Sequence, residues 1–199
     1  MAEAMVLAGV DEVGRGAIFG PVVAAAVILT ETATSNLQNF GVQDSKRLSS
    51  KRREALVEPI YDLATDCQIG LATVSEIDRL NILQASLLAM QRAVLKLSPV
   101  PDLCRVDGNQ RILGLGIAQE TIVKGDQIDC AIAAASIIAK VWRDNLVIRL
   151  SKQYPDYDLE SNKGYGTSQH RLALEKLGLT PHHRRSFRCC QLELPLLST

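Results

Sequence analysis

Val6-Leu-Ala-Gly-Val-Asp-Glu-Val-Gly-Arg-Gly16 places an apolar run, two acids and a glycine-rich turn in direct succession near the start of this 199-residue chain. A second apolar run, rich in β-branched residues, follows at residues 21–29. Short apolar runs of this kind, bounded by glycine and proline, are typical of buried strands. We therefore expect two neighbouring strands, the first of which ends at Asp11.

Outward from this pair, the pattern predicts three more strands and four helices. The strands are expected at 68–73, 103–106 and 120–123. The helices are expected from Ser49 or Ser50 to 64, from Asn81 to 97, over 128–153, and in a short stretch closed by Gly178. This order predicts an α/β fold, a mixed central sheet with helices on both faces. We expect one domain over 1–199, in which about 155–199 form a small helical and irregular C-terminal segment.

Composition excludes several classes of protein. Hydrophobic residues make up 47% and charged residues 22%, which is ordinary for a globular protein and wrong for a disordered one. The net charge is zero, but residues 161–188 carry six Lys and Arg against one acid, which favours contact with phosphates at this end. Five cysteines without a Cys-x-x-Cys pair, no convincing signal peptide and no long apolar run indicate a cytoplasmic location.

Acidic residues stand where predicted strands end. Asp11 and Glu12 end the first strand, Asp107 ends a later one, and Asp126 lies between a third strand and the long helix. Carboxylates that converge at strand ends form an all-oxygen site that suits Mg²⁺ or Mn²⁺, with room for two ions. The alternative is that each acid caps a turn or a helix, and for a single Asp that alternative is favoured.

The glycine-rich turn after the acids limits which kinds of ligand-binding site the sequence can form. Gly14 and Gly16 flank Arg15 two residues after the acids, and such a turn lets backbone groups approach a ligand closely. A dinucleotide-binding turn would open a helix, whereas a strand-like run follows here, and no Walker A sequence is present.

Seven motifs together resemble ribonuclease HII. In chain order they are Ala8-Gly-Val-Asp-Glu-Val-Gly-Arg-Gly16, Asp44-Ser-Lys46, Val106-Asp-Gly108, Lys124-Gly-Asp126, Ala134-Ala-Ser-Ile-Ile-Ala-Lys-Val141 with Arg143 and Asp144, Lys163-Gly-Tyr165, and His183-Arg184 with Ser186-Phe187. The resemblance implies a ribonuclease H-like fold and two-metal hydrolysis of RNA paired with DNA. It also implies incision at a ribonucleotide embedded in DNA, leaving a 3′ hydroxyl.

The resemblance also assigns residues to roles. Four carboxylates, Asp11, Glu12, Asp107 and Asp126, would bind metal, although Asp129 competes with Asp126. Gly14, Arg15 and Gly16 would contact the ribose 2′-OH, and Tyr165 would pack against the sugar on the DNA side of the junction. The remaining substrate-binding residues would be Asp44, Ser45, Lys46, Ser136, Lys140, Lys163, His183 and Arg184.

Three of these assignments can be weighed from the residues themselves. Ser136, Lys140 and Arg143 share one helix face, which suits either phosphate contact or a solvated polar stripe. Tyr165 stands between glycines, which favours an exposed contact residue over a core residue. Adjacent His182 and His183 have no further ligand at metal-binding spacing, which favours a structural or phosphate role.

The sequence also suggests a protein partner and a substrate, and it leaves two other functions open. Gln191-Leu-Glu-Leu-Pro-Leu196 loosely resembles peptides that dock into a sliding clamp, and the alternative is a tail packed on its own domain. The substrate would be an RNA/DNA hybrid or DNA containing ribonucleotides, bound by a monomer. Competing functions are a non-catalytic module that binds RNA/DNA hybrids and another nuclease of the same superfold, such as a junction resolvase.

Overall fold

A five-stranded mixed sheet forms the centre of the molecule in a computed structural model, which describes residues 5–42 and 47–191. The strand order is β3 (Asp66–Ala72), β2 (Val22–Ile28), β1 (Leu7–Val13), β4 (Leu103–Asp107) and β5 (Ala118–Ile122). The strand β1 pairs antiparallel with β2 and parallel with β4, and β4 pairs parallel with β5. The predicted mixed sheet is therefore confirmed, with both parallel and antiparallel pairs.

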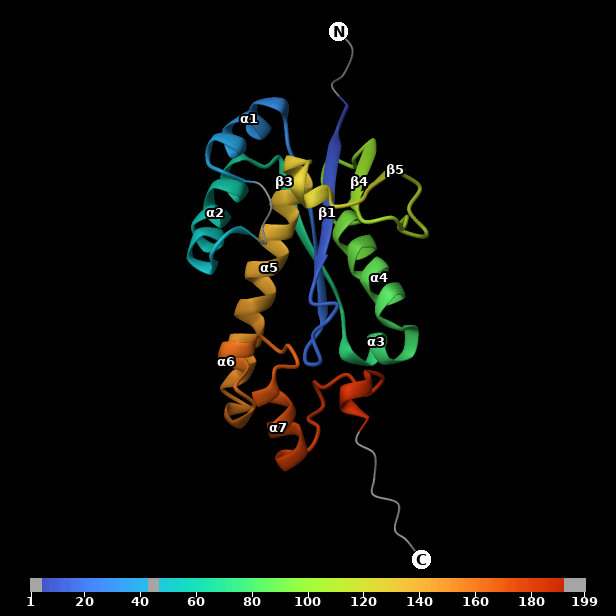
Figure 1. Ribbon diagram of the computed structural model, residues 1–199. Helices are drawn as coiled ribbons and strands as arrows, with labels where there is room; N and C mark the ends of the chain where they lie inside the picture. Colours follow the sequence, from blue (N-terminus) through green and yellow to red (C-terminus); the bar gives the residue numbers. More distant parts are fainter. Residues whose placement is uncertain (1–4, 43–46, 192–199) are drawn as a thin grey trace, which may run out of the picture.

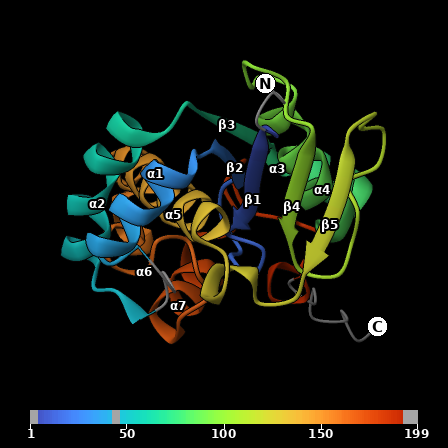
Figure 2. The same cartoon turned by 90° about the horizontal axis from the view of Figure 1, so that it is seen from above.

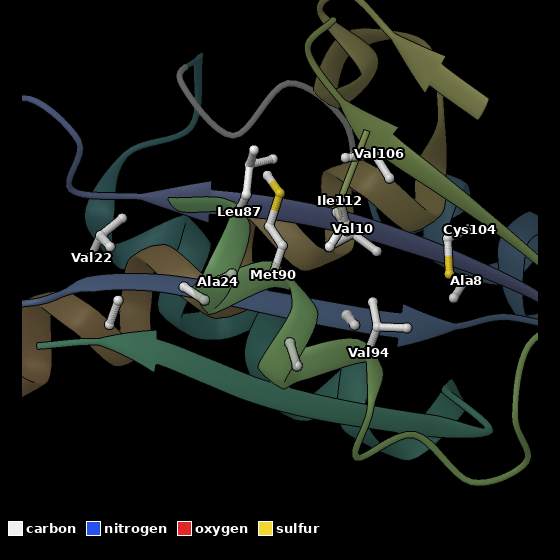
Figure 3. Close-up of a cluster of buried hydrophobic side chains, with 14 of the residues drawn as sticks. Ala8, Val10, Val22, Ala24, Leu87, Met90, Val94, Cys104, Val106 and Ile112 are labelled. Atoms are coloured by element: carbon white, nitrogen blue, oxygen red, sulfur yellow. The ribbon is translucent and has the colours of Figure 1, made fainter. Parts of the chain in front are cut away.

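Helices cover both faces of the sheet (Figure 2). The long helix α5 (Cys130–Ser151) packs on one face with α1 (Glu31–Asn39) and α2 (Ser50–Leu63), while α4 (Ile82–Val94) and α3 (Val74–Leu80) lie on the other side. Alternate residues of β2 serve the two layers: Val22, Ala24 and Ala26 join the core beneath α4, part of which is drawn in Figure 3. The intervening residues of β2 face α5 and α2.

Two strand glycines let the main helices approach the sheet closely. A Cβ atom added at Gly9 of β1 would lie 2.2 Å from the backbone of Ala131 in α5. A Cβ atom added at Gly70 of β3 would lie 2.1 Å from the carbonyl oxygen of Ala89 in α4. Because no larger residue fits at either position, these glycines fix the distance between the sheet and its two helix layers.

The C-terminal segment forms a third core at one end of the sheet (Figure 1). It contains η3 (Pro155–Tyr157), α6 (Leu159–Asn162), α7 (Ser168–Leu177) and η4 (Arg188–Cys190). The loop that follows β1 joins this core through backbone bridges from Ala17 to Tyr165 and from Phe19 to His183. The glycine-rich turn is therefore held between the sheet and the C-terminal segment.

Three helices were not predicted from the sequence: α1, α3 and the short α6. Thr30 caps α1 by accepting a hydrogen bond from the Ala33 amide, and Thr73 forms a capping box with Glu76 at the start of α3. A short 3-10 helix, η2 (Gly125–Gln127), also precedes α5. Within the described part of the chain, no helix is both long enough and apolar enough to cross a membrane.

Candidate active site

A pocket of 370 Å³ collects the acids of β1 and β4 together with basic and aromatic side chains. We call it the acidic pocket. Its lining comes from β1, the turn after it, α2, β4, α5 and the loop before α7. The lining residues are Asp11, Glu12, Val13, Arg15, Arg53, Asp107, Ser136, Lys140 and Tyr165.

Strand register brings Asp11 and Asp107 side by side. The parallel strands β1 and β4 pair Val10 with Val106, so the next residue of each strand projects from the same face. Asp11 is only 5% exposed, and its side chain hydrogen-bonds with Ser136 of α5. Asp107 accepts a hydrogen bond of 2.7 Å from the Gly125 amide. The two acids thus converge as expected. Only Asp107 ends its strand, however, because β1 continues past Asp11 to Val13.

Electrostatic repulsion accompanies this convergence. Burial, followed by the nearby charges of Glu12 and Asp107, raises the pKa of Asp11 well above its usual value. Burial also raises the pKa of Glu12, although Arg15 opposes this shift with a hydrogen bond of 3.1 Å. Each carboxylate therefore makes it harder for its neighbours to ionise, and a cation at this position would relieve the repulsion.

The chemistry of the donors fits a hard divalent cation, because every acidic ligand offers oxygen. Across residues 5–42 and 47–191, however, no group of three or more His, Cys, Asp or Glu side chains is arranged to hold a metal ion. The carboxylates thus share a pocket without forming a preformed metal cage.

The fourth carboxylate lies beside the acidic pocket rather than in its lining. Asp126 follows the Gly125 amide that Asp107 binds, and its side chain is 1% exposed next to a separate hollow. Its competitor Asp129 is already engaged, because one oxygen caps α5 at the Ile132 amide and the other pairs with Arg105 at 2.8 Å. These contacts count against Asp129 as the fourth carboxylate of the site.

The glycine turn, residues 14–16, adjoins the acidic pocket. Gly14 has a φ of +89°, which a residue with a side chain rarely adopts. Gly16 is exposed, and an added Cβ atom would meet nothing within 4 Å. Internal packing therefore explains a glycine at the first position but not at the second.

Tyr165 is half-buried at the edge of the acidic pocket, between two cations of α5. The Lys140 ammonium lies 5.3 Å from the ring centroid, and the Arg143 guanidinium lies 5.5 Å from it. Lys140 also pairs with Asp144 at 2.9 Å. The lysine and the ring therefore lie in contact with each other in the lining of the acidic pocket.

Burial bears on several of the basic and polar residues singled out in the sequence. The face of Ser136, Lys140 and Arg143 is not a solvated stripe, since Ser136 is 7% and Arg143 0% exposed. His183 and Arg184 are only 1% and 0% exposed, and neither side chain lines the acidic pocket. They bind other parts of the protein instead, because Arg184 donates to the carbonyl oxygens of Arg15 and Gly20.

The remaining predicted residues lie outside the acidic pocket or outside the described residues, and one residue of the pocket was not predicted. Lys163 is half-buried outside the lining of the acidic pocket, and its ammonium donates to the Glu160 carbonyl oxygen. Arg53 of α2 lines the pocket but was missed, although the basic run Lys51-Arg-Arg53 on a predicted first helical turn was a usable signal. Three expected residues lie outside the described part of the chain: Asp44, Ser45 and Lys46.

The family model for ribonuclease HII matches residues 8–190. This chain belongs to the ribonuclease HII family. A ribonuclease HII of Acaryochloris marina is 61% identical over 188 residues, which cover 94% of this chain and 95% of the relative. That of Trichodesmium erythraeum is 62% identical and covers 94% of this chain and 89% of the relative.

Solved structures agree with the family assignment. Ribonuclease H2 from Pyrococcus horikoshii matches with a TM-score of 0.82 at 28% identity, covering 94% of this chain and 96% of that one. Ribonuclease HII from Archaeoglobus fulgidus, solved in a complex with PCNA, matches with a TM-score of 0.79 at 27% identity, covering 92% and 96%. A ribonuclease HIII, at 17% identity, shares the fold. The predicted ribonuclease H-like fold is therefore confirmed.

Membership of the ribonuclease HII family also confirms the class of activity. Enzymes of this family are divalent-metal-dependent endoribonucleases of the ribonuclease H type, and this chain is one of them. The non-catalytic binding module is thereby set aside.

Proposed function

We propose that this enzyme hydrolyses the RNA strand of RNA/DNA hybrids and incises duplex DNA on the 5′ side of a single embedded ribonucleotide. In the cell it would remove misincorporated ribonucleotides and RNA primers. The observation that carries this proposal is the composition of the acidic pocket, which combines carboxylates, the adjoining glycine turn and Tyr165. The last two features suit a substrate in which a ribose is followed by a second sugar, because one can contact a 2′-OH and the other a sugar face.

The carboxylates of Asp11, Glu12, Asp107 and Asp126 would hold two Mg²⁺ or Mn²⁺ ions. Such ions, when bound, lower the pKa of a water molecule and neutralise charge that builds up on the phosphate. Hydrolysis joins the water oxygen to phosphorus and breaks the bond to the 3′ oxygen. The products therefore carry a 3′ hydroxyl and a 5′ phosphate.

The glycine turn would distinguish a ribose from a deoxyribose in the substrate. Gly16 leaves open space above the backbone, so a sugar can approach the amide and carbonyl groups of residues 14–16. A 2′-OH is the group that distinguishes RNA from DNA at a given nucleotide. A deoxyribose at this position would leave the polar groups of the turn unpaired, at a cost of roughly 1–3 kcal/mol for each group.

Tyr165 and the cations position the substrate. The ring would pack on the deoxyribose that follows the ribonucleotide, and Lys140 beside it would meet a backbone phosphate. Ser136 and Lys163, with Asp44, Ser45 and Lys46 outside the described residues, are proposed to help in holding phosphates.

A four-substrate cleavage assay tests this function. The protein is incubated with Mg²⁺ or Mn²⁺ and, in parallel, DNA carrying one ribonucleotide, an RNA tract paired with DNA, all-DNA duplex and a four-way junction. We expect cleavage of the first two substrates only, with a 3′ hydroxyl on the upstream product. Cleavage of the four-way junction, or equal cleavage of all-DNA duplex, would refute the proposal.

Cellular setting and partner form a second part of the proposal. All five cysteines are free thiols, which suits the reducing cytoplasm, and we expect a monomer, to be checked by mass in solution. The likeness to an archaeal ribonuclease HII solved with PCNA supports sliding-clamp binding through residues 191–197. Residues 192–197 lie outside the described part of the chain. Titration of a fluorescent 191–197 peptide against clamp protein tests this, and no saturation by high micromolar concentration would end the idea.

A further inference from the structure

Arg143 lies at the junction of two loops that the proposed function uses for different tasks. Its side chain is 0% exposed, and each guanidinium nitrogen donates to a backbone carbonyl oxygen. Nε binds Pro21 at 3.1 Å, Nη2 binds Phe19 at 2.9 Å, and Nη1 binds Lys163 at 2.9 Å. One planar group therefore fastens the loop after β1 to the loop that carries Tyr165.

Three glycines with positive φ surround this guanidinium. They are Gly14, Gly20 and Gly164, with φ values of +89°, +80° and +82°. A Cβ atom added at Gly14 would lie 2.1 Å from Nε of Arg143, and one added at Gly164 would lie 3.4 Å from Nη2. Both loops are thus bent around the arginine, and the glycine turn lies directly against it.

The same two loops also bond to each other. The amides of Ile18 and Phe19 donate to the Gly164 carbonyl oxygen at 2.9 and 3.2 Å, and Ala17 forms a backbone bridge with Tyr165. The Arg143 guanidinium also lies 5.5 Å from the centroid of the Tyr165 ring. The arginine therefore contacts both the glycine turn and the tyrosine.

We propose that Arg143 is a positioning residue that sets selectivity for the junction between a ribonucleotide and a deoxyribonucleotide. It does so by fixing the spacing between the glycine turn, which senses the ribose, and Tyr165, which contacts the next sugar. This inference rests on the proposed function, because it assigns both contacts to a substrate. A single embedded ribonucleotide needs both contacts at once, whereas a continuous RNA tract lacks the deoxyribose partner of Tyr165.

The variant Arg143→Lys tests the hydrogen-bond geometry of the guanidinium separately from its positive charge. A lysine keeps the positive charge but cannot present three donors in one plane to three carbonyl oxygens. Because displacements of about 1 Å can cost a hundred-fold in rate, we expect kcat/KM on single-ribonucleotide DNA to fall more than about ten-fold and kcat/KM on the RNA tract to fall less than roughly three-fold. The measured quantity is the ratio of the two values.

Tyr157→Phe is the matched control. It removes only the hydrogen bond of 2.8 Å from the tyrosine hydroxyl to the carbonyl oxygen of Gly178, a residue that belongs to neither loop, and it keeps the ring. Loss of stability alone lowers the active fraction for both substrates equally, so the control ratio should match that of the native protein. Melting temperatures of all variants are recorded beside the rates.

Gly164→Ala is the second variant, in case Arg143→Lys does not fold. Its added Cβ atom would lie 2.8 Å from the Phe19 carbonyl oxygen and would push the two loops apart without removing the buried charge. We expect the same loss of ratio. In the double variant Arg143→Lys/Tyr165→Ala, the ratio should be no lower than in Tyr165→Ala alone, since Arg143 acts through that residue.

The results for the native protein test the proposed function, and the results for the variants test the role of Arg143. A native protein that cleaves neither substrate, or that ignores the embedded ribonucleotide, overturns the proposed function and the role of Arg143 with it. A native protein with the expected activity, whose ratio is unchanged in both Arg143→Lys and Gly164→Ala, overturns the role of Arg143 alone. The role of Arg143 would also be overturned if the two substitutions lowered the kcat/KM ratio independently, so that their effects multiplied in the double variant.

Discussion

This enzyme has two clusters of buried charge, one on β1 and one around the loop that follows β1. Their charges are balanced in opposite ways. In the acidic pocket, Asp11 and Glu12 face other carboxylates, and both have a raised pKa of which burial is the largest cause. Around the loop that follows β1, Arg143 of α5 and Arg184 of the C-terminal segment donate to backbone carbonyl oxygens of that loop. The first cluster is under repulsion, whereas the second is mostly satisfied by the protein itself.

This difference separates groups that serve a ligand from groups that serve the fold. A charge whose balance must come from outside costs stability in the free protein, so its removal should be harmless or even stabilising. A buried charge that bonds to the backbone holds the chain in place, and its removal leaves carbonyl groups unpaired. Substitutions in the two clusters should therefore have opposite effects on stability and activity.

Asp107→Asn should give the largest loss of activity with little cost in stability. The amide oxygen can still accept the hydrogen bond from the Gly125 amide, while the charge that a cation needs is gone. Loss of even an outer partner of a metal ligand costs about 10–100-fold, so loss of a direct ligand should cost more than about 100-fold in cleavage rate. The melting temperature should stay unchanged or rise. Near-normal turnover at saturating Mg²⁺ would remove Asp107 from the metal site.

Arg184→Met should do the reverse and destabilise the fold. The guanidinium is 0% exposed and donates to the carbonyl oxygens of Gly20 and Arg15 at 3.0 and 2.9 Å. Each orphaned carbonyl costs roughly 1–3 kcal/mol, so the free energy of unfolding should fall by about 3 kcal/mol. Urea denaturation measures it, and Arg185→Met at the exposed neighbour is the matched control. Equal stability of the two variants would show that burial of Arg184 contributes nothing to the fold.

The strand-end acids could be predicted from sequence because local patterns determine them. Apolar runs locate the strands, and an acid that follows such a run lies near the carboxyl end of its strand, as for Asp11 and Asp107. The capping box of Thr73 and Glu76 was equally local, and the α3 helix could have been found from it. The competition between Asp126 and Asp129 was not decidable, because it depends on Arg105, an ion-pair partner distant in sequence.

The buried arginines could not be predicted in the same way. Arginine is almost never fully buried unless it is paired, so a helix face with Ser136, Lys140 and Arg143 suggests solvent or phosphate. What buries Arg143 is a set of three carbonyl oxygens, two of them more than 120 residues away in sequence. No periodicity within the helix records such partners, and only the packing of the C-terminal segment reveals them.

Tyr165→Ala should have an intermediate effect, restricted to one substrate. Cleavage of DNA with a single embedded ribonucleotide should fall more than about ten-fold, a loss of about 1.4 kcal/mol in transition-state stabilisation. Cleavage within a long RNA tract should fall by a smaller factor, since that substrate lacks the deoxyribose partner. Tyr165→Phe keeps the ring between Lys140 and Arg143 and serves as the control. Equal losses on both substrates would make Tyr165 a general positioning or folding residue.

The pH dependence of stability should show the smallest effect, and it arises in the second cluster. Burial, followed by the charges of His170 and His182, lowers the pKa of His183 to about 4. In the unfolded chain a histidine titrates near 6.5, so between these values the unfolded state binds the proton more readily. The contribution of His183 is therefore constant above about pH 6.5, is lost as pH falls toward 4, and changes no further below that.

His183→Asn makes this contribution measurable by subtraction. Nδ1 of His183 accepts from the Thr180 amide at 3.0 Å, and the asparagine oxygen can occupy a similar position without titrating near neutral pH. Every carboxylate is common to both proteins, so their titration cancels in the difference. Between pH 6.5 and 5.5, native stability should fall by about 1 kcal/mol relative to the variant, since one unit of pH in this window is worth at most about 1.4 kcal/mol. Parallel urea denaturation curves at each pH measure the difference. If the two proteins lose stability in parallel over this range, the pKa of His183 is not lowered in the folded enzyme. Its Nδ1 would then carry a proton at pH 5.5 and could not accept from the Thr180 amide.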